Sequence, residues 1–188
     1  EGINSTISGD RDQIDLFKEK LCHYNEFSNL AFKESYSESE PFRRMLVKIK
    51  KELITMKKNK IDPTKETGTY LDPVEFKKWQ DNNKDMIIVD TRNDYEVKLG
   101  TFKKAIKPNI NSFSEVPEWV DQNRQNDKDK KIITFCTGGI RCEKATAYMK
   151  QKGFKQVYQI EGGILNYLEK SNASKDGDHW QCECVVFD

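Results

Sequence analysis

The sequence predicts an α/β fold in which helices cover both faces of a mostly parallel sheet, preceded by a partial small α+β sandwich domain. Strand-sized apolar runs at residues 86–90 and 131–136 alternate with helical patterns, as is typical of parallel sheets buried on both faces. Residues 3–56 instead combine one amphipathic helix with strands whose side chains alternate between apolar and polar. A charged segment that contains Pro63 separates the two patterns, so we expect two domains.

The first domain is predicted over residues 1–56. A strand is expected over residues 3–8, and Asp10 then stands where a helix N-cap belongs, before apolar residues at helical spacing. From Phe42 to near Met56 the alternation predicts another strand, with Met45, Val47 and Ile49 on one face. This strand–helix–strand order indicates part of a ferredoxin-like or acylphosphatase-like unit.

The second domain is predicted over residues 68–170, after a polar linker at residues 57–67. Asp72 followed by Pro73 is a typical helix start, because the aspartate caps the helix and proline fits its first turn. The predicted helices cover residues 74–80, 114–122, 143–152 and 162–168, and the predicted strands cover residues 86–90, 131–136 and 157–160. Residues 171–188 are expected to begin a C-terminal tail that contains cysteines.

Composition narrows the class of protein. The 188 residues carry a formal net charge of +1, so any attraction to nucleic acid must come from a local patch. No apolar run approaches the roughly 20 residues that cross a bilayer, and no secretory leader is visible, so we expect a cytoplasmic protein without a membrane partner. Because the chain opens at Glu1 and stops at Asp188 inside structural patterns, we expect it to be part of a longer protein.

The five cysteines favour a reducing compartment, because their odd number and irregular spacing do not fit a disulfide framework. Cys142 has two interpretations, a second redox thiol or a small residue buried in the first turn of a helix. Cys182 and Cys184 form only a Cys-x-Cys pair without further zinc ligands, so no metal site is predicted.

One of these cysteines, Cys136, follows a predicted strand and opens a glycine-rich loop. The strand at residues 132–135 delivers it to the carboxyl edge of the sheet, where open α/β folds place their sites. Gly138 and Gly139 let the backbone curl so that successive N–H groups point at one centre, and the helix after Arg141 turns its positive end there. Such surroundings lower a cysteine pKa from about 8.5 to between roughly 3.5 and 7.5. The pattern predicts a reactive thiolate; a buried structural cysteine on a glycine turn is the alternative.

Residues 43–60 concentrate positive charge, with eight basic side chains and one acidic one. On the predicted strand, Arg44, Lys48 and Lys50 form a ladder on one face. With Arg43, they are candidates for contacts to RNA phosphates. The alternative is a solvated outer face of an edge strand, where lysines prevent aggregation.

Residues 68–170 resemble a rhodanese domain. Its opening is similar to Gly68-Thr-Tyr-Leu-Asp-Pro-Val-Glu-Phe76, and its first motif to Asp90-Thr-Arg92 with Glu96 and Gly100. The resemblance implies that Cys136 is the nucleophile or sulfur acceptor and that Asp90 and Arg92 are supporting residues. The active loop corresponds to Cys136, Thr137, Gly138, Gly139, Ile140 and Arg141, and the closing segment to Gly162 and Gly163. Cysteine phosphatases place five residues between their cysteine and arginine where this loop has four, so a phosphatase is disfavoured.

Across essentially its whole length the chain is similar to the rhodanese-domain tRNA uridine hydroxylases. The similarity rests on Glu1-Gly-Ile-Asn4, Pro41-Phe-Arg-Arg-Met45, Asp90-Thr-Arg-Asn-Asp-Tyr-Glu96, Gly100-Thr-Phe102, Cys136-Thr-Gly-Gly-Ile-Arg-Cys-Glu-Lys144 and Cys184-Val-Val-Phe-Asp188. It implies oxygen-dependent hydroxylation of the wobble uridine to 5-hydroxyuridine, with tRNA as the partner rather than DNA. Molecular oxygen is the implied co-substrate, and no cofactor is evident in the sequence. The resemblance also implies a sandwich domain that begins before Glu1 and a cysteine-rich tail after Asp188.

Two other functions remain open at this stage. Cys136 could cycle through a persulfide and transfer sulfur, as the loop of backbone N–H groups would also stabilise that anion. Alternatively, the chain could bind RNA without catalysis and retain the loop as architecture. The oligomeric state does not follow from the sequence.

Overall fold

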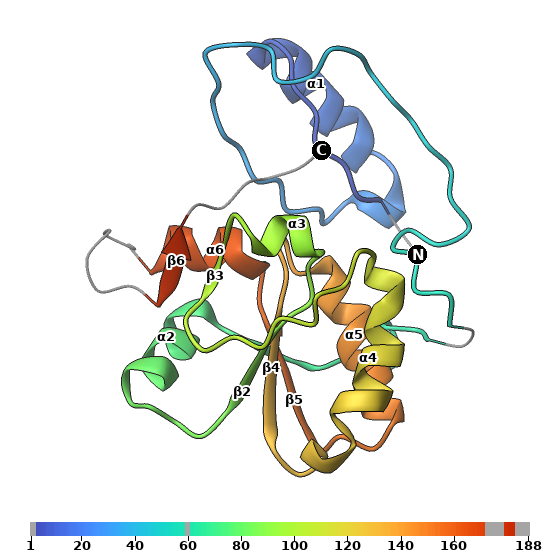
Figure 1. Ribbon diagram of the computed structural model, residues 1–188. Coiled ribbons are helices and arrows are strands. Elements are labelled where there is room, and N and C mark those ends of the chain that lie inside the picture. The colour runs from blue at the N-terminus through green and yellow to red at the C-terminus, as the bar shows by residue number, and fades with distance from the viewer. Residues whose placement is uncertain (1–2, 59–60, 172–178, 183–188) are drawn as a thin grey trace. The chain divides into compact units, whose positions relative to one another are not determined.

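The computed structural model describes residues 3–58, 61–171 and 179–182 (Figure 1). The chain divides into two compact units, Glu1–Leu53 and Ile54–Phe187, each of which is described below by itself.

The first unit contains helix α1 (Arg11–Cys22) and the short helix η1 (Asn25–Phe27). The helix predicted from apolar spacing is therefore confirmed, and Asp10 occupies the N-cap position, although its side chain makes no capping hydrogen bond. Exposed ion pairs join Arg11 to Asp15 and to Glu34 at 2.8 and 2.7 Å.

The two strands predicted for this unit are absent from its described residues, so that part of the prediction is wrong. Residues 3–8 and 42–50 form no ladder, and the side chains of Met45, Val47 and Ile49 are 79%, 80% and 100% exposed. Alternation places apolar side chains on one face, but a strand persists only where a neighbouring strand pairs with its backbone and something covers that face. The described residues of this unit provide neither.

The second unit is built on a four-stranded parallel sheet, which confirms the predicted α/β architecture. The strands are β1 (Thr69–Leu71), β5 (Gln156–Ile160), β4 (Lys131–Phe135) and β2 (Ile87–Asp90), in that spatial order. Within it, Val89 pairs with Thr134, and Thr134 with Gln159. The three-residue strand β1 was not predicted, because three residues do not establish a period.

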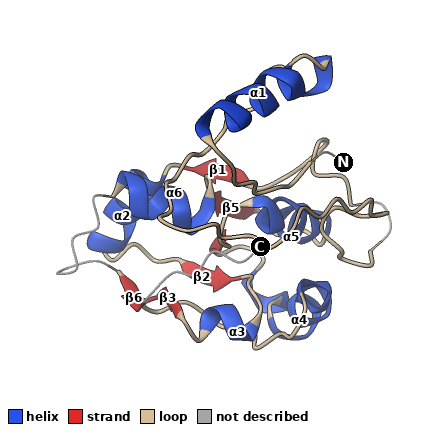
Figure 2. Cartoon of the chain, turned by 90° about the horizontal axis from the view of Figure 1, so that it is seen from above, coloured by secondary structure: helices blue, strands red, loops and turns tan. Residues whose placement is uncertain are grey.

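Helices cover both faces of this sheet, as Figure 2 shows from above. Helices α2 (Pro73–Asp81) and α6 (Gly163–Lys170) pack on one face, and α4 (Val116–Asn123) and α5 (Ile140–Gln151) on the other. Side chains alternate across a strand, so Ile132 joins the cluster under α4 and α5 while Ile133 joins the cluster under α2 and α6. Asp72 caps α2 as predicted, accepting from the N–H of Val74 at 2.8 Å.

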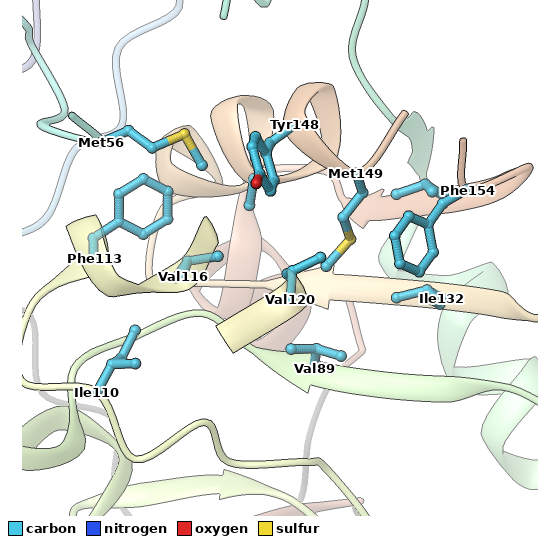
Figure 3. Packing of buried hydrophobic residues seen from close by; sticks show 12 residues of the cluster. Met56, Val89, Ile110, Phe113, Val116, Val120, Ile132, Tyr148, Met149 and Phe154 are labelled. Atoms are coloured by element: carbon cyan, nitrogen blue, oxygen red, sulfur yellow. The ribbon is translucent and has the colours of Figure 1, made fainter. Parts of the chain in front are cut away.

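Met56, expected at the end of the first domain, instead lies in the core of the second unit. It is 1% exposed and belongs to the cluster that contains Phe113, Val116 and Tyr148 (Figure 3). The partly buried Ile61 packs against the same cluster. Apolar side chains on both sides of the charged residues at 57 and 58 therefore bind the start of the predicted linker to this core.

The remaining elements are short segments outside the four-stranded sheet. They are α3 (Asp94–Val97), β3 (Gly100–Phe102), η2 (Phe113–Glu115), η3 (Gln125–Asp127) and β6 (Trp180–Cys182). Part of the predicted tail folds back here, since β6 pairs antiparallel with β3 and Trp180 lies 5.0 Å from the ring of Phe102. Cys184 lies outside the described residues. In the described ranges, no helix is both long and apolar enough to cross a membrane.

Candidate active site

Cys136 lies at the carboxyl end of β4, where the sequence placed it, and its side chain is fully buried. Gly139 adopts a φ of +95° at the N-cap of α5, and its N–H donates to the Cys136 sulfur at 3.1 Å. A left-handed φ of this kind is readily adopted by glycine and costs other residues energy. The backbone therefore curls around the sulfur as predicted for a loop that binds an anion.

The surroundings of Cys136 favour its thiolate. Burial alone would raise the pKa, but the hydrogen bond from the Cys142 thiol, the charge of Arg141 and the N–H groups of Arg141 and Cys142 outweigh it. Together they lower the Cys136 pKa from its ordinary 9.0 to about 6. At neutral pH the sulfur is therefore mostly ionised and nucleophilic.

Helix α6 holds this loop from the other side through its first residues. The N–H of Ile164 donates to the Cys136 carbonyl at 3.0 Å, and the N–H of Leu165 to the Thr137 carbonyl at 3.2 Å. Gly163 has a φ of +64°, and a Cβ there would stand 2.4 Å from the Cys136 carbonyl oxygen. Gly163 lets the helix approach closely enough to make these bonds.

Arg141 is bound by Glu96, which sequence reasoning noted only as part of a motif. Each guanidinium N–H lies 2.6 Å from a carboxylate oxygen of Glu96, and the Thr137 hydroxyl donates to the same carboxylate at 3.2 Å. Burial opposes ionisation of Glu96, but the bonds from Arg141 outweigh it and lower the Glu96 pKa. The arginine is thus fixed beside the loop, where its charge acts on the thiolate.

The remaining loop residues are more exposed than Cys136. Gly138 is exposed and faces open space, since a Cβ there would meet no atom within 4 Å. Thr137 and Ile140 are half-buried, and Ile140 begins α5.

Asp90 and Arg92 form a separate buried ion pair beside the loop. Arg92 donates to both Asp90 carboxylate oxygens, at 3.0 and 2.7 Å, and also to the Gly100 carbonyl. Its guanidinium lies 5.3 Å from the ring of Trp180, and no described hydrogen bond joins the pair to the loop from Cys136 to Arg141. The pair therefore joins the end of β2 to β3, and its supporting role in the site stays a prediction.

Thr91, between them, contacts the residues on either side of the loop, and sequence reasoning missed it. Its hydroxyl donates to the Phe135 carbonyl at 2.9 Å and lies 3.5 Å from the Cys142 sulfur. A threonine after a strand is common, so its residue type alone predicts no contact. The available signal was its position between Asp90 and Arg92.

The four basic residues named as RNA contacts, Arg43, Arg44, Lys48 and Lys50, are exposed in the first unit. The predicted ladder is wrong, because residues 43–50 form no strand in the described structure. The cations are free to meet a polyanion, but they are not ordered along one face of a sheet. Their RNA-binding role stays a prediction.

Each of the two units matches a known protein family. Residues 1–53 match the UPF0176 acylphosphatase like domain, and residues 72–170 match the rhodanese-like domain. A curated tRNA uridine(34) hydroxylase of Legionella pneumophila strain Paris is 50% identical over 189 residues, covering 100% of this chain and 73% of that protein. The protein of the same name from strain Corby has the same identity and coverage. The chain belongs to the tRNA uridine(34) hydroxylase family.

The similarity to solved structures is weaker. The solution structure of a rhodanese-like domain from Anabaena is 17% identical, covers 62% of this chain and 81% of that chain, and has a TM-score of 0.49. For this member of the tRNA uridine(34) hydroxylase family, the geometry adds Thr91, Glu96 and Gly163 to the residues that shape the loop. Among the described residues, no group of three or more histidine, cysteine or acidic side chains is arranged to hold a metal ion.

Proposed function

We propose that this chain hydroxylates C5 of uridine-34 in tRNA, with molecular oxygen as co-substrate and Cys136 as the reacting thiolate. The observation that carries the proposal is a buried cysteine with a pKa lowered to about 6, in a chain half identical along its whole length to proteins named for this modification. A thiolate at neutral pH is the form that attacks an electrophilic ring carbon.

The thiolate activates the pyrimidine by addition at C6. The C–S bond forms as the C5=C6 electron pair moves onto C5 and the C4 carbonyl, which makes C5 nucleophilic toward oxygen. O₂ bonds to C5 as a hydroperoxide, and a two-electron reductant cleaves its O–O bond, which leaves a hydroxyl on C5 and releases the other oxygen as water. Loss of the C5 proton then expels the thiolate and restores the C5=C6 bond. Overall, uridine, O₂, two electrons and two protons give 5-hydroxyuridine and water, so a two-electron reductant such as a dithiol must accompany the reaction.

The buried position of Cys136 gives this step a low dielectric. The Gly139 N–H donates to the sulfur at 3.1 Å, and the backbone N–H groups of Arg141 and Cys142 also favour its charged form. The same N–H groups stabilise the negative charge of the sulfur again when the thiolate leaves the ring.

The exposed cations of the first unit supply affinity for tRNA in this proposal. Arg43, Arg44, Lys48 and Lys50 would contact phosphates, which provides binding that depends on salt and not on sequence. The reacting uridine itself must be recognised in the second unit, beside Cys136.

Mass spectrometry of nucleosides from treated tRNA tests the proposal. The chain is incubated with tRNA and a dithiol reductant in air and under nitrogen, beside a Cys136→Ser variant. We expect 5-hydroxyuridine with the wild type in air alone. If tRNA stays unmodified while a sulfur donor adds one sulfur atom to Cys136, the loop transfers sulfur and the proposal fails.

A further inference from the structure

Cys142 is a buried thiol that the proposed reaction does not use. It is 0% exposed in the first turn of α5, and Cys136 is also 0% exposed. Gly139 connects the two residues, because its N–H donates to the Cys136 sulfur at 3.1 Å and its carbonyl accepts from the Cys142 N–H at 3.0 Å. The same Gly139 peptide therefore contacts both residues, and neither side chain is exposed to solvent.

The Cys142 thiol proton has few possible hydrogen-bond acceptors. The Thr91 hydroxyl, 3.5 Å from the Cys142 sulfur, donates its own proton to the Phe135 carbonyl at 2.9 Å. Thr134, the other hydroxyl beside Cys142, donates to the Tyr158 carbonyl at 3.2 Å. A threonine hydroxyl has one proton, so both side chains can only accept from Cys142. The acceptors of the Cys142 proton are therefore two neutral oxygens and the Cys136 sulfur.

Charge decides among these acceptors. When Cys136 is ionised, its sulfur is the one anionic acceptor of the three, and hydrogen bonds to ionised groups are about twice as strong as neutral ones. We propose that Cys142 is a positioning residue, whose thiol turns its hydrogen bond from the threonines to the Cys136 sulfur and so keeps that sulfur ionised within the loop.

The titration of the two thiols follows from this arrangement. Burial and the neighbouring Cys136 raise the pKa of Cys142 well above its ordinary value, so Cys142 keeps its proton while Cys136 loses its own. Cys142 thus serves as the hydrogen-bond donor and Cys136 as the nucleophile, as happens when the pKa values of two neighbouring titratable groups are shifted in opposite directions.

Other charges near the pair do not replace this bond. Arg141 of α5 is the charged side chain that acts on the Cys136 sulfur, and Glu96 of α3 binds its guanidinium. From β2, Asp90 is engaged by Arg92, and Lys144 further along α5 donates to the Ile54 carbonyl. Removing the Cys142 thiol leaves the charge of Arg141 and the backbone N–H groups to stabilise the thiolate alone.

The inference rests on the proposed function only in taking Cys136 as the reacting group, and its test needs no tRNA. The chain is prepared with cysteine labelled by ¹³C at Cβ, kept reduced, and titrated by nuclear magnetic resonance. Resonances of the wild type, Cys142→Ser, Cys142→Ala and Thr91→Val are followed from acid to alkaline pH, so failure of the inference is separate from failure of hydroxylation.

In the wild type we expect the Cys136 resonance to titrate near pH 6 and the Cys142 resonance to shift at that same midpoint without ionising. Cys142→Ala should raise the Cys136 midpoint by about one pH unit or more, and Cys142→Ser, which keeps a donor, by less than about half a unit. Thr91→Val removes a competing acceptor together with the hydrogen bond to the neutral Phe135 carbonyl, so the midpoint should not rise.

A Cys136 midpoint unchanged in a folded Cys142→Ala variant would overturn the inference. If that variant does not fold, a midpoint raised in Thr91→Val, or a wild-type Cys142 resonance indifferent to the ionisation of Cys136, does the same. Loss of thermal stability in Cys142→Ala and Cys142→Ser without any shift in the midpoint assigns Cys142 to packing and rejects the inference.

Discussion

Arg141 and Glu96 are joined by two hydrogen bonds of 2.6 Å each, across 45 residues of sequence. The Arg141 side chain is 17% exposed and that of Glu96 is 4% exposed. The pair ties the start of α5 to α3, so the segments that follow β2 and β4 meet beside the Cys136 loop.

Replacing Glu96 with glutamine should therefore destabilise the fold. Arg141 would keep its charge in a mostly buried position with only the Cys136 thiolate as a neighbouring anion, and breaking a buried ion pair costs about 3 to 5 kcal/mol. Urea denaturation measures the change in unfolding free energy. Asp94→Asn on the same helix breaks the exposed pair with Lys98 and is the matched control, with an expected cost below about 1 kcal/mol.

The effect of Glu96→Gln should also depend on pH. The folded-state pKa of Glu96 is lowered, so its contribution is complete above the unfolded value of about 4.3 and is lost as pH falls through the folded value. The wild type and the variant should differ at pH 6 and converge in acid. An equal difference at both pH values would contradict the ion-pair explanation.

Gly163→Ala should disrupt the loop more than its backbone angle alone explains. The new Cβ would stand 2.4 Å from the Cys136 carbonyl oxygen and 2.5 Å from that of Thr137, so α6 must move away. Gly153→Ala is the matched control, because Gly153 also has a positive φ, of +87°, but nothing lies within 4 Å of its Cβ position. Thermal unfolding should show a loss of about 1 to 2 kcal/mol for the control and clearly more for Gly163→Ala. Equal losses would show that the close approach of α6 is unimportant.

The rate of uridine hydroxylation should follow the ionisation of Cys136. With a pKa lowered to about 6, the attacking thiolate disappears as pH falls, so the rate should drop about tenfold per pH unit below 6 and level off above 7. Single-turnover formation of 5-hydroxyuridine measures it, and Cys22→Ser, in the first unit, should leave the profile unchanged. A rate that continues to rise up to about pH 8.5 would indicate an ordinary thiol.

Asp90→Asn should weaken the fold without changing the reactive thiol. The carboxylate is fully buried and binds Arg92, so the variant leaves a buried uncompensated guanidinium at a cost of about 3 to 5 kcal/mol. A double variant, Asp90→Leu with Arg92→Met, should recover part of this loss in urea denaturation. The Cys136 titration midpoint should stay in place; a shift of a pH unit would mean that the pair acts on the chemistry.

Neutralising the cations of the first unit should weaken tRNA binding and flatten its salt dependence. With Arg43, Arg44, Lys48 and Lys50 replaced by glutamine, each lost phosphate contact should reduce the slope of log affinity against log salt by roughly 0.7 to 0.9. Filter binding at several salt concentrations measures it. The control of equal charge replaces four exposed lysines outside residues 43–60 together, namely Lys20, Lys78, Lys103 and Lys107. An equal loss in both variants would mean that the basic segment has no special role.

Local patterns were sufficient for much of the second unit. The continuous apolar runs at residues 86–90 and 131–136 predict strands buried on both faces, and hence a parallel sheet. Strands β2 and β4 form there and are buried as expected. The Cys136 loop was also predictable, because a strand, two glycines and a helix start are consecutive in sequence. The first unit shows where the same reasoning stops: residues 42–50 alternate as a strand does, yet nothing in the described part of that unit pairs with them.

Contacts between distant segments had no such local signal. Met56 follows a basic segment, yet it is buried because Phe113 and Tyr148 offer it an apolar surface. Glu96 matters because its side chain binds Arg141. Gly163 matters because its lack of a side chain lets α6 approach the loop. Hydrophobic period and turn chemistry are properties of neighbours along the chain, so they could be read from the residues printed above. The pairing of a buried charge, the proton of Cys142 and the ionisation of Cys136 depend on which groups meet once water is excluded, and that meeting exists only in the folded chain.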